Sequence, residues 1–249
     1  MTDSIPQQAN ISLVIPAYQE EKRIAHTIDS LSTYLEKTHP GAELIVVCDG
    51  CTDGTAATAR ASFKSSTCSL KVIELTPNHG KGAAVQAGMM EAKGDYIFFT
   101  DADLSFEPEL LELFLHALLE GADVAAAQRK KETKYPGLGR KVLAKVSRFL
   151  VGNLVLPGMR DTQAGYKGFK REAARFLFKR LRTKRFLFDL EILMRARKKG
   201  YRIEKVLVDW KDQPGSTVRL YVDTIRAARD LIFICTRSFF ESCFVKDEE

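Results

Sequence analysis

Strand-like and helix-like segments alternate along the first half of the sequence, and this alternation restricts the fold more than any other feature. Apolar runs typical of buried strands occur at Ile11–Ile15, Glu43–Cys48 and Tyr96–Phe99. Segments with apolar residues at helical spacing separate them. Such alternation is typical of an α/β sandwich with a largely parallel sheet. We therefore predict an α/β fold with a mostly parallel sheet flanked by helices.

Local chemistry predicts where several elements begin and end. Pro16 should stop the first strand, because proline has no backbone N–H to donate. The first helix should begin near Gln19, with Glu20 and Glu21 in its first turn, where the helix dipole favours carboxylates. A fifth strand is expected at Ala122–Ala127.

The second half of the sequence is expected to depart from this regular pattern. Its polar, glycine-punctuated stretch Asp161–Gly168 should form a loop or an edge strand. Helices should follow at Arg171–Arg180 and from Phe188 to Lys199, and a strand is expected at Val206–Trp210.

Two aspartates, Asp101 and Asp103, follow the apolar run Tyr96–Phe99 almost directly. Desolvating a carboxylate is costly unless something pairs with it, and a divalent cation such as Mg²⁺ prefers oxygen ligands and also binds phosphates. The alternative is a polar turn before a helix. Ligands of parallel sheets bind beyond the carboxyl ends of the strands. Other distinctive residues fall at such ends, which favours a metal–diphosphate site; they are Pro16–Tyr18, Asp49–Gly50 and Lys81–Gly82.

Composition narrows the classes of partner. The chain has 38 Lys and Arg against 32 Asp and Glu, a formal net charge of +6, which suits a phosphate-rich ligand, nucleic acid or an anionic membrane. No zinc-finger, homeodomain or RNA-binding aromatic pattern supports a nucleic-acid module. Cys48-x-x-Cys51 has no second Cys or His pair to complete a metal site. No run of about 18 apolar residues predicts a spanning helix, and the absence of a signal peptide predicts a reducing cytoplasm.

Two basic amphipathic helices are expected late in the chain. Arg140–Leu156 combines Val, Leu and Phe with four basic residues, and Leu220–Phe244 carries an apolar stripe widened by phenylalanines. Each helix could pack on the sheet or on a second subunit, or lie on a membrane surface. We expect a flexible N-terminus at 1–10, one domain at 11–218, and a C-terminal amphipathic helix and tail at 219–249.

The motifs, taken in chain order, resemble those of family 2 glycosyltransferases with the Rossmann-like GT-A fold. The resemblance is carried by Ile15–Glu21, Cys48–Thr55, Asn78–Gly82 and Asp101–Leu104. Cys51 stands where the family commonly has Ser. Later stretches resemble dolichyl-phosphate β-glucosyltransferases and their polyprenyl-phosphate relatives, namely Asp161–Phe169, Phe188–Glu191 and Trp210–Val218.

This resemblance implies a nucleotide pocket at the end of the first strand. Pro16, Ala17, Tyr18 and Glu20 would line the pocket for the base and ribose, and Asp49 would accept a hydrogen bond from the base. The likeness to the glucosyl branch implies that uracil binds more tightly than guanine.

The resemblance also implies a metal–diphosphate centre. Asp101 and Asp103 would hold Mg²⁺ or Mn²⁺, with Asp103 as the more direct ligand, and Lys81 would meet a diphosphate oxygen. Relatives in the mannosyl branch have Gln at the position of Ser105, which argues against a direct metal role for this serine.

Three further side chains have open roles. Arg129, expected just after the fifth strand, would face a donor or acceptor phosphate, or be a solvated charge beside its lysine neighbours. Asp189 and Glu191 are candidate general bases, although a phosphate acceptor is already an anion and needs no strong base. They could instead orient the acceptor or its basic ligands, or be a helix-start pair favoured by the dipole.

The function implied is inverting transfer of a hexose, expected to be glucose from UDP-glucose, to a polyprenyl or dolichyl phosphate. We expect a peripheral protein on the cytoplasmic face of a membrane, held there directly or by an anchored partner. One alternative is a GDP-mannose-dependent dolichyl-phosphate mannosyltransferase or another family 2 sugar transferase. The alternative from another class is a non-catalytic module that binds nucleotides or nucleic acid.

Overall fold

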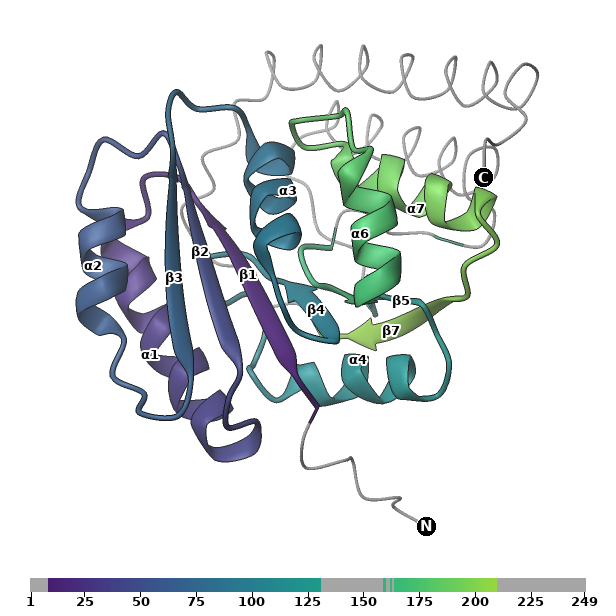
Figure 1. Cartoon of the computed structure of the whole chain (residues 1–249), viewed down its shortest axis with the longest axis horizontal. Coiled ribbons are helices and arrows are strands. Elements are labelled where there is room, and N and C mark those ends of the chain that lie inside the picture. The colour runs from purple at the N-terminus through teal and green to yellow at the C-terminus, as the bar shows by residue number, and fades with distance from the viewer. Residues whose placement is uncertain (1–8, 131–158, 160–161, 163, 210–249) are drawn as a thin grey trace.

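The computed structural model describes residues 9–130, 159, 162 and 164–209. In this part of the chain a seven-stranded sheet has the order β3-β2-β1-β4-β6-β5-β7 (Figure 1). Every strand pair is parallel except the two that β6 makes. The elements are β1 (Ile11–Ala17), α1 (Glu21–Thr38), β2 (Glu43–Asp49), α2 (Thr55–Ser62), β3 (Ser69–Leu75), α3 (Lys81–Glu91), β4 (Tyr96–Phe99), α4 (Leu110–Leu119), β5 (Val124–Arg129), β6 (Lys167–Lys170), α6 (Arg171–Lys179), α7 (Phe188–Lys198) and β7 (Ile203–Val208).

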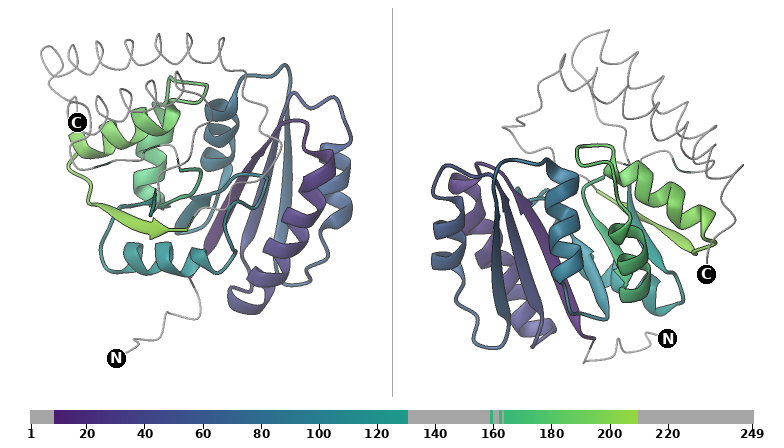
Figure 2. Two further views of the ribbon diagram at one scale, coloured as in Figure 1. Left: turned by 180° about the vertical axis from the view of Figure 1, so that it is seen from behind. Right: turned by 45° about the horizontal axis from the view of Figure 1, so that its top comes forward.

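Helices cover both faces of the sheet. One core contains residues of α1, α2 and α4, and a second core on the other face contains residues of α3, α6 and α7. Figure 2 shows α3, α6 and α7 together on one side and α1 on the opposite side. Alternate residues of β1 enter the two cores, with Leu13 and Ile15 in the first and Val14 in the second. The predicted α/β fold with a mostly parallel sheet is therefore confirmed.

The stretch Asp161–Gly168 was expected to be a loop or an edge strand, and the edge-strand prediction is wrong for its end. Lys167 and Gly168 begin β6, which lies inside the sheet between β4 and β5 and runs antiparallel to both. A Cβ on Gly168 would come within 2.6 Å of the Phe98 ring, so the glycine permits close packing at this central position. Residues 160, 161 and 163 lie outside the described part of the chain.

Two predicted boundaries near the first strand are also wrong. Strand β1 does not stop at Pro16 but continues to Ala17. Pro16 is tolerated because the register of β1 with β4 covers only Ile11–Val14, while Pro16 lies opposite Val47 of β2. Helix α1 begins at Glu21 rather than near Gln19, whose φ of 56° lies in the left-handed region.

Two later boundaries differ as well. Arg129 is the last residue of β5 rather than a residue after it, because β5 stays paired with β7 as far as Val208. Strand β7 covers Ile203–Val208, three residues earlier at its start than predicted. The predicted strand ends at Trp210, which lies outside the described residues.

Several predictions fall on residues outside the described part. They are the amphipathic helices Arg140–Leu156 and Leu220–Phe244, the stretch Trp210–Val218, and the domain limits that depend on them. Among the helices of the described residues, none is both long enough and apolar enough to cross a bilayer.

Candidate active site

The predicted site segments meet at one edge of the sheet. Strands β2, β1 and β4 are neighbours and parallel, so their carboxyl ends lie side by side. Tyr18 follows β1, Asp49 ends β2, and Asp101 and Asp103 follow β4. Lys81 is the first residue of α3, which begins at this same edge. The structure thus brings together residues that are far apart in the sequence, as the motif positions predicted.

Asp49 fixes the glycine-rich turn before α3. Its carboxylate, only 3% exposed, accepts the backbone N–H of His79 at 2.8 Å and that of Gly80 at 2.6 Å. The Asn78 amide donates to the Asp49 carbonyl at 2.7 Å. Gly50 has a φ of 70°, and a Cβ there would come within 2.5 Å of the Asn78 nitrogen. Asp49 therefore holds the turn in place, and its predicted contact with a base stays a prediction.

Lys81 and Asp101 form an ion pair at the centre of this edge. The Lys81 Nζ lies 2.5 Å from Asp101 Oδ1, and both side chains are about one quarter exposed. Burial is the largest single influence and acts to lower the pKa of Lys81, but the nearby carboxylates of Asp101, Asp189 and Asp103 together raise it, so the ammonium stays charged. A Cβ on Gly165 would come within 2.1 Å of Asp101 Oδ2, so a larger residue there would require the Asp101 carboxylate to move.

Asp103 is held in a different way. Its Oδ1 accepts the backbone N–H of Ser105 at 3.1 Å and the Ser105 hydroxyl at 2.7 Å. Leu104 between them has a φ of 48°, which lets the chain turn so sharply. No hydrogen bond within the described residues uses Oδ2 of Asp103. That oxygen remains available to a ligand.

The two aspartates fit a Mg²⁺ or Mn²⁺ ion that also binds a substrate. Mg²⁺ is usually bound by one or two carboxylates together with water and substrate phosphates. Within the described residues, no group of three or more metal-binding side chains is present. Among the described residues, Asp101 and Asp103 would therefore be the protein ligands, and water or a diphosphate could complete the coordination. A third protein ligand is not needed for this type of site.

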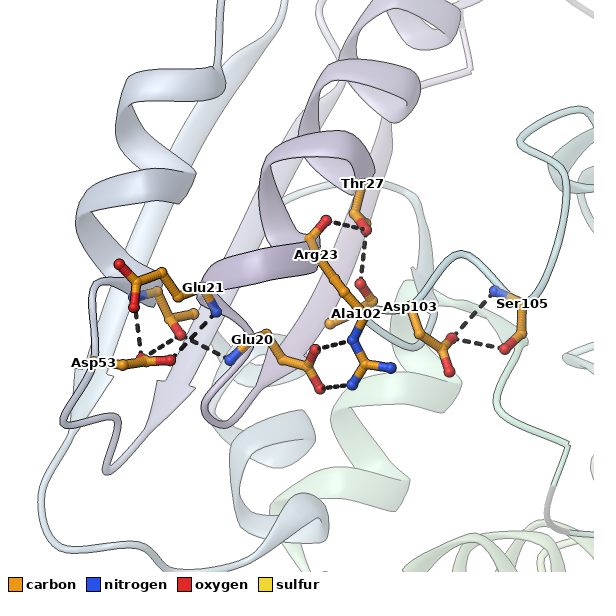
Figure 3. Close-up of polar contacts among 9 residues, drawn as sticks. Glu20, Glu21, Arg23, Thr27, Asp53, Ala102, Asp103 and Ser105 are labelled. Carbon is orange, nitrogen blue, oxygen red and sulfur yellow. Dashed lines mark hydrogen bonds and ion pairs between the residues drawn. The ribbon is translucent and has the colours of Figure 1, made fainter. Parts of the chain in front are cut away.

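Glu20 and Arg23, at the start of α1, lie beside the loop that carries Asp103 (Figure 3). Arg23 Nε and Nη2 donate to the Glu20 carboxylate at 2.7 and 2.8 Å. This bond raises the pKa of Arg23. Figure 3 shows the guanidinium between Glu20 and Asp103. The Thr27 hydroxyl donates to the Ala102 carbonyl at 2.6 Å. Sequence reasoning missed Arg23, although a Glu and an Arg three residues apart at a helix start are a recognisable pair.

The end of β1 and the residues after it differ in exposure. Pro16 and Ala17, the last residues of the strand, are buried, whereas Tyr18 is 48% exposed. Gln19 exchanges two hydrogen bonds with Thr52, at 2.8 and 2.9 Å. This pair fixes the left-handed turn of Gln19 and thereby the direction of the Tyr18 backbone. Sequence reasoning did not identify the Gln19–Thr52 pair.

Asp189 forms a buried ion pair with a lysine that the sequence analysis did not select. Lys167 is fully buried, and its Nζ lies 2.6 Å from Asp189 Oδ1 and 2.8 Å from the Ala164 carbonyl. Burial raises the pKa of Asp189 even though Lys167 and Lys81 oppose the shift. The signal for Lys167 was its place in the polar stretch that also contains Gly165.

Glu191 and Arg129 have different surroundings. Glu191 accepts the backbone N–H groups of Arg182 and Thr183, the latter at 2.7 Å, and lies 3.5 Å from Arg195. Glu191 therefore stabilises the loop between α6 and α7. Arg129 is half-buried at the carboxyl end of β5, on the same edge of the sheet as the aspartates. The roles proposed for both as base or phosphate ligand stay predictions.

Comparison with known proteins agrees with this arrangement. Residues 12–178 match the family description "Glycosyl transferase family 2". The chain is 32% identical over 243 residues to a dolichyl-phosphate beta-glucosyltransferase of Drosophila melanogaster, covering 91% of this chain and 74% of the relative. A human protein of the same name is 33% identical, with 91% and 75% covered.

A solved structure shares the fold. Glucosyl-3-phosphoglycerate synthase of Mycobacterium tuberculosis, in complex with Mn²⁺, UDP-glucose and phosphoglyceric acid, superimposes with a TM-score of 0.69 at 22% identity. The match covers 96% of this chain and 82% of that one. The likeness supports the GT-A arrangement predicted from the motifs. Because the family model matches residues 12–178, more than half of the chain, this protein belongs to glycosyltransferase family 2.

Proposed function

We propose that this glycosyltransferase moves glucose from UDP-glucose to a polyprenyl or dolichyl phosphate, with inversion at the anomeric carbon. The observation that carries the proposal is the meeting of Lys81, Asp101 and Asp103 at the carboxyl end of the central strand, beside Tyr18. The relatives named above are dolichyl-phosphate beta-glucosyltransferases, which supports both the sugar and the acceptor. The complex of the mycobacterial structure supports a UDP-sugar donor.

The nucleotide would bind at the ends of β1 and β2. The exposed ring of Tyr18 offers an apolar face to a base, and Asp49 holds the adjoining turn with two charge-assisted hydrogen bonds. A turn fixed in this way presents its remaining polar groups in a single geometry. Glu20, oriented by Arg23, lies on the ribose side of this pocket in the proposal.

The diphosphate would lie between α3 and the loop after β4. Asp101 and Asp103 would hold Mg²⁺ or Mn²⁺, which when bound supplies positive charge to the leaving diphosphate. Lys81 carries a permanent positive charge at the N-terminus of α3, where the helix dipole also favours an anion. These charges would stabilise the negative charge that develops on the departing nucleoside diphosphate.

Transfer itself would be a single displacement. A phosphate oxygen of the acceptor attacks the anomeric carbon, that carbon's bond to the diphosphate oxygen breaks, and UDP leaves with the electron pair. Asp189 is not needed as a strong base, because the attacking oxygen is already anionic. The buried Asp189 and Lys167 pair would instead fix the wall of the site below the acceptor. Arg129 would face the donor or acceptor phosphate from the end of β5.

A lipid acceptor also implies where in the cell the enzyme acts. We propose that the enzyme acts as a peripheral protein on the cytoplasmic face of a membrane, where nucleotide sugars and lipid phosphates are both accessible. The net charge of +6 favours an anionic surface.

A donor and acceptor screen tests the proposal. Purified protein would be incubated with UDP-glucose, UDP-galactose or GDP-mannose, a short-chain polyprenyl phosphate and Mg²⁺ or Mn²⁺, and the glycolipid measured by mass spectrometry. We expect glucosyl phospholipid from UDP-glucose and none in excess EDTA. Efficient transfer from GDP-mannose would support the mannosyltransferase alternative. No transfer with any donor, together with tight filter binding of nucleic acid, would support the non-catalytic module.

A further inference from the structure

The loop between α6 and α7, residues 180–187, concentrates positive charge beside the candidate site. Exposed basic side chains include Lys179 at the end of α6 and Arg180, Arg182 and Arg185 in the loop, while the exposed Lys184 donates to Gln86. Phe186, on the same loop, is 43% exposed and is one of the few large apolar side chains exposed in the described residues. We call Lys179, Arg180, Arg182, Arg185 and Phe186 the basic rim. Figure 1 shows this loop beside the start of α3, where Lys81 lies.

The backbone of this loop is fixed against the site. The Lys184 carbonyl accepts the Ala83 N–H at 3.1 Å, and a Cβ on Gly82 would come within 2.6 Å of the Thr183 carbonyl oxygen. Glu191 holds the loop from its other side through two backbone N–H groups. The basic rim therefore has a defined position at the mouth of the diphosphate region.

The basic side chains of the rim lack the partners that exposed cations have elsewhere. Within the described residues, none of the four makes an ion pair with a carboxylate, whereas Arg60 pairs with Glu74 and Lys71 with Glu91, both at 2.6 Å. The Arg180 guanidinium lies over the Phe176 ring instead. Unpaired cations around an exposed aromatic ring suit a surface that offers both negative charge and an apolar layer.

We propose that the basic rim docks on the surface of an anionic lipid bilayer. Its cations would meet the phosphate and carboxylate groups of the lipids, and the Phe186 ring would enter the boundary between headgroups and acyl chains. Docking at this point would place the mouth of the site at the depth of a lipid phosphate. The inference rests on the proposed lipid acceptor and adds the element that brings the site to it.

A nucleic acid would also attract the cations, but it explains Phe186 less well. Single strands bind through basic grooves with several aromatic platforms, and the loop has one ring among its cations. The bilayer is therefore the occupant that the charge and the ring both favour.

Vesicle flotation with the full chain tests the inference. The vesicles would be phosphatidylcholine alone or phosphatidylcholine with phosphatidylserine. We expect wild-type protein to float with the anionic vesicles and to be released by salt. Arg182→Gln with Arg185→Gln should lower the partition coefficient by roughly 30-fold, since each basic residue near such a surface changes it by roughly fivefold. Phe186→Ser should weaken binding without changing its salt dependence.

A matched double variant controls for general charge. Lys37→Gln with Lys64→Gln removes two exposed lysines, one in the last turn of α1 and one just after α2, at the opposite edge of the sheet. It should float as wild type does. Equal flotation of the Arg182/Arg185 variant and wild type, no flotation of wild type at low salt, or binding of wild type to single-stranded RNA but not to vesicles would each overturn the inference.

Transfer to a soluble acceptor separates this inference from the proposed function. With a short-chain polyprenyl phosphate in detergent, the Arg182/Arg185 variant should retain wild-type turnover, because these side chains do not touch the aspartates or Lys81. With long-chain acceptor in anionic vesicles, the same variant should lose most turnover. Failure of wild type with the soluble acceptor would refute the proposed function while leaving the flotation result to decide the docking.

Discussion

At the scale of single residues, Asp101 and Asp103 differ in what holds them. Asp101 is paired with Lys81 and lies against Gly165, while among the described residues Asp103 accepts hydrogen bonds from Ser105 alone, both on one oxygen. We predict that Asp103→Asn lowers kcat by about 100-fold or more, because it weakens the hold on the metal ion whose positive charge would stabilise the leaving group. Steady-state kinetics at saturating Mn²⁺ measure the effect.

The fold should survive this substitution, since asparagine keeps the oxygen that accepts from Ser105. Asp29→Asn, on the exposed face of α1, is the matched control and should leave turnover unchanged. If Asp103→Asn melts with wild type and turns over at the wild-type rate, the role assigned to Asp103 is wrong.

The buried pair of Lys167 and Asp189 makes a second prediction at this scale. Lys167→Met leaves a carboxylate buried without its cation, which typically costs about 3–5 kcal/mol. Replacing both residues, as in Lys167→Met with Asp189→Leu, should cost less than the single change because no charge is stranded. Urea unfolding of the two variants measures this difference. A double variant less stable than Lys167→Met would mean that the pair itself, rather than the stranded charge, supplies the stability.

At the scale of elements, a buried hydrogen-bond cluster joins α1 to α4. Glu112 of α4 accepts from the Tyr34 hydroxyl at 2.7 Å and lies 2.8 Å from His39 Nε2. Burial acts to raise the pKa of Glu112, but its bonds to His39 and Tyr34 outweigh burial, so the pKa is lowered. The folded state therefore holds this carboxylate ionised at pH values where the unfolded chain has begun to protonate it.

This lowered pKa predicts a loss of stability in acid. The contribution of Glu112 is complete above its ordinary pKa of 4.5 and is lost as the pH falls through the lower value of the folded state. Glu112→Gln should lower the free energy of unfolding by about 1–3 kcal/mol at neutral pH, and by less at acid pH. Chemical denaturation across this pH range tests it, with the exposed Glu109→Gln as control. An equal loss at both pH values would contradict the linkage.

How far the sequence predicts an element depends on how local its causes are. Strand β4 and the two aspartates that follow it are predictable, because an apolar run followed by carboxylates is a local signal. The place of β6 inside the sheet is not, because its pairing with β4 and β5 depends on residues far away in the chain. The extension of β1 through Pro16 likewise depends on where β4 ends.

The same distinction applies to the candidate site. Motif positions predict Asp49, Lys81 and the aspartates, because each lies at a strand or helix end that the pattern identifies. Lys167 escaped prediction because a buried lysine is recognised only through its partner, Asp189, which is distant in sequence. Arg23 was not predicted because its position beside Asp103 depends on how the loop after β4 folds against α1, which the local pair with Glu20 does not reveal.

At the scale of the whole molecule, the site is assembled from β1, β2, α3 and the loop after β4, so a ligand there would contact several segments that are far apart in the chain. A ligand that binds only the folded state raises its stability, by about 2.7 kcal/mol at a concentration 100 times its Kd. For a domain of this size that corresponds to a rise in Tm of about 5–10 °C. We predict this rise with UDP and Mn²⁺ together, and a smaller one with GDP and Mn²⁺ at the same concentration.

Asp103→Asn should abolish the part of the rise in Tm that depends on Mn²⁺ but keep the part given by UDP alone, because only the metal contact is removed. Differential scanning fluorimetry with each nucleotide, with and without EDTA, measures both parts. A larger rise with GDP would assign the pocket to guanine, and a rise with UDP that is the same in EDTA would separate nucleotide binding from the two aspartates.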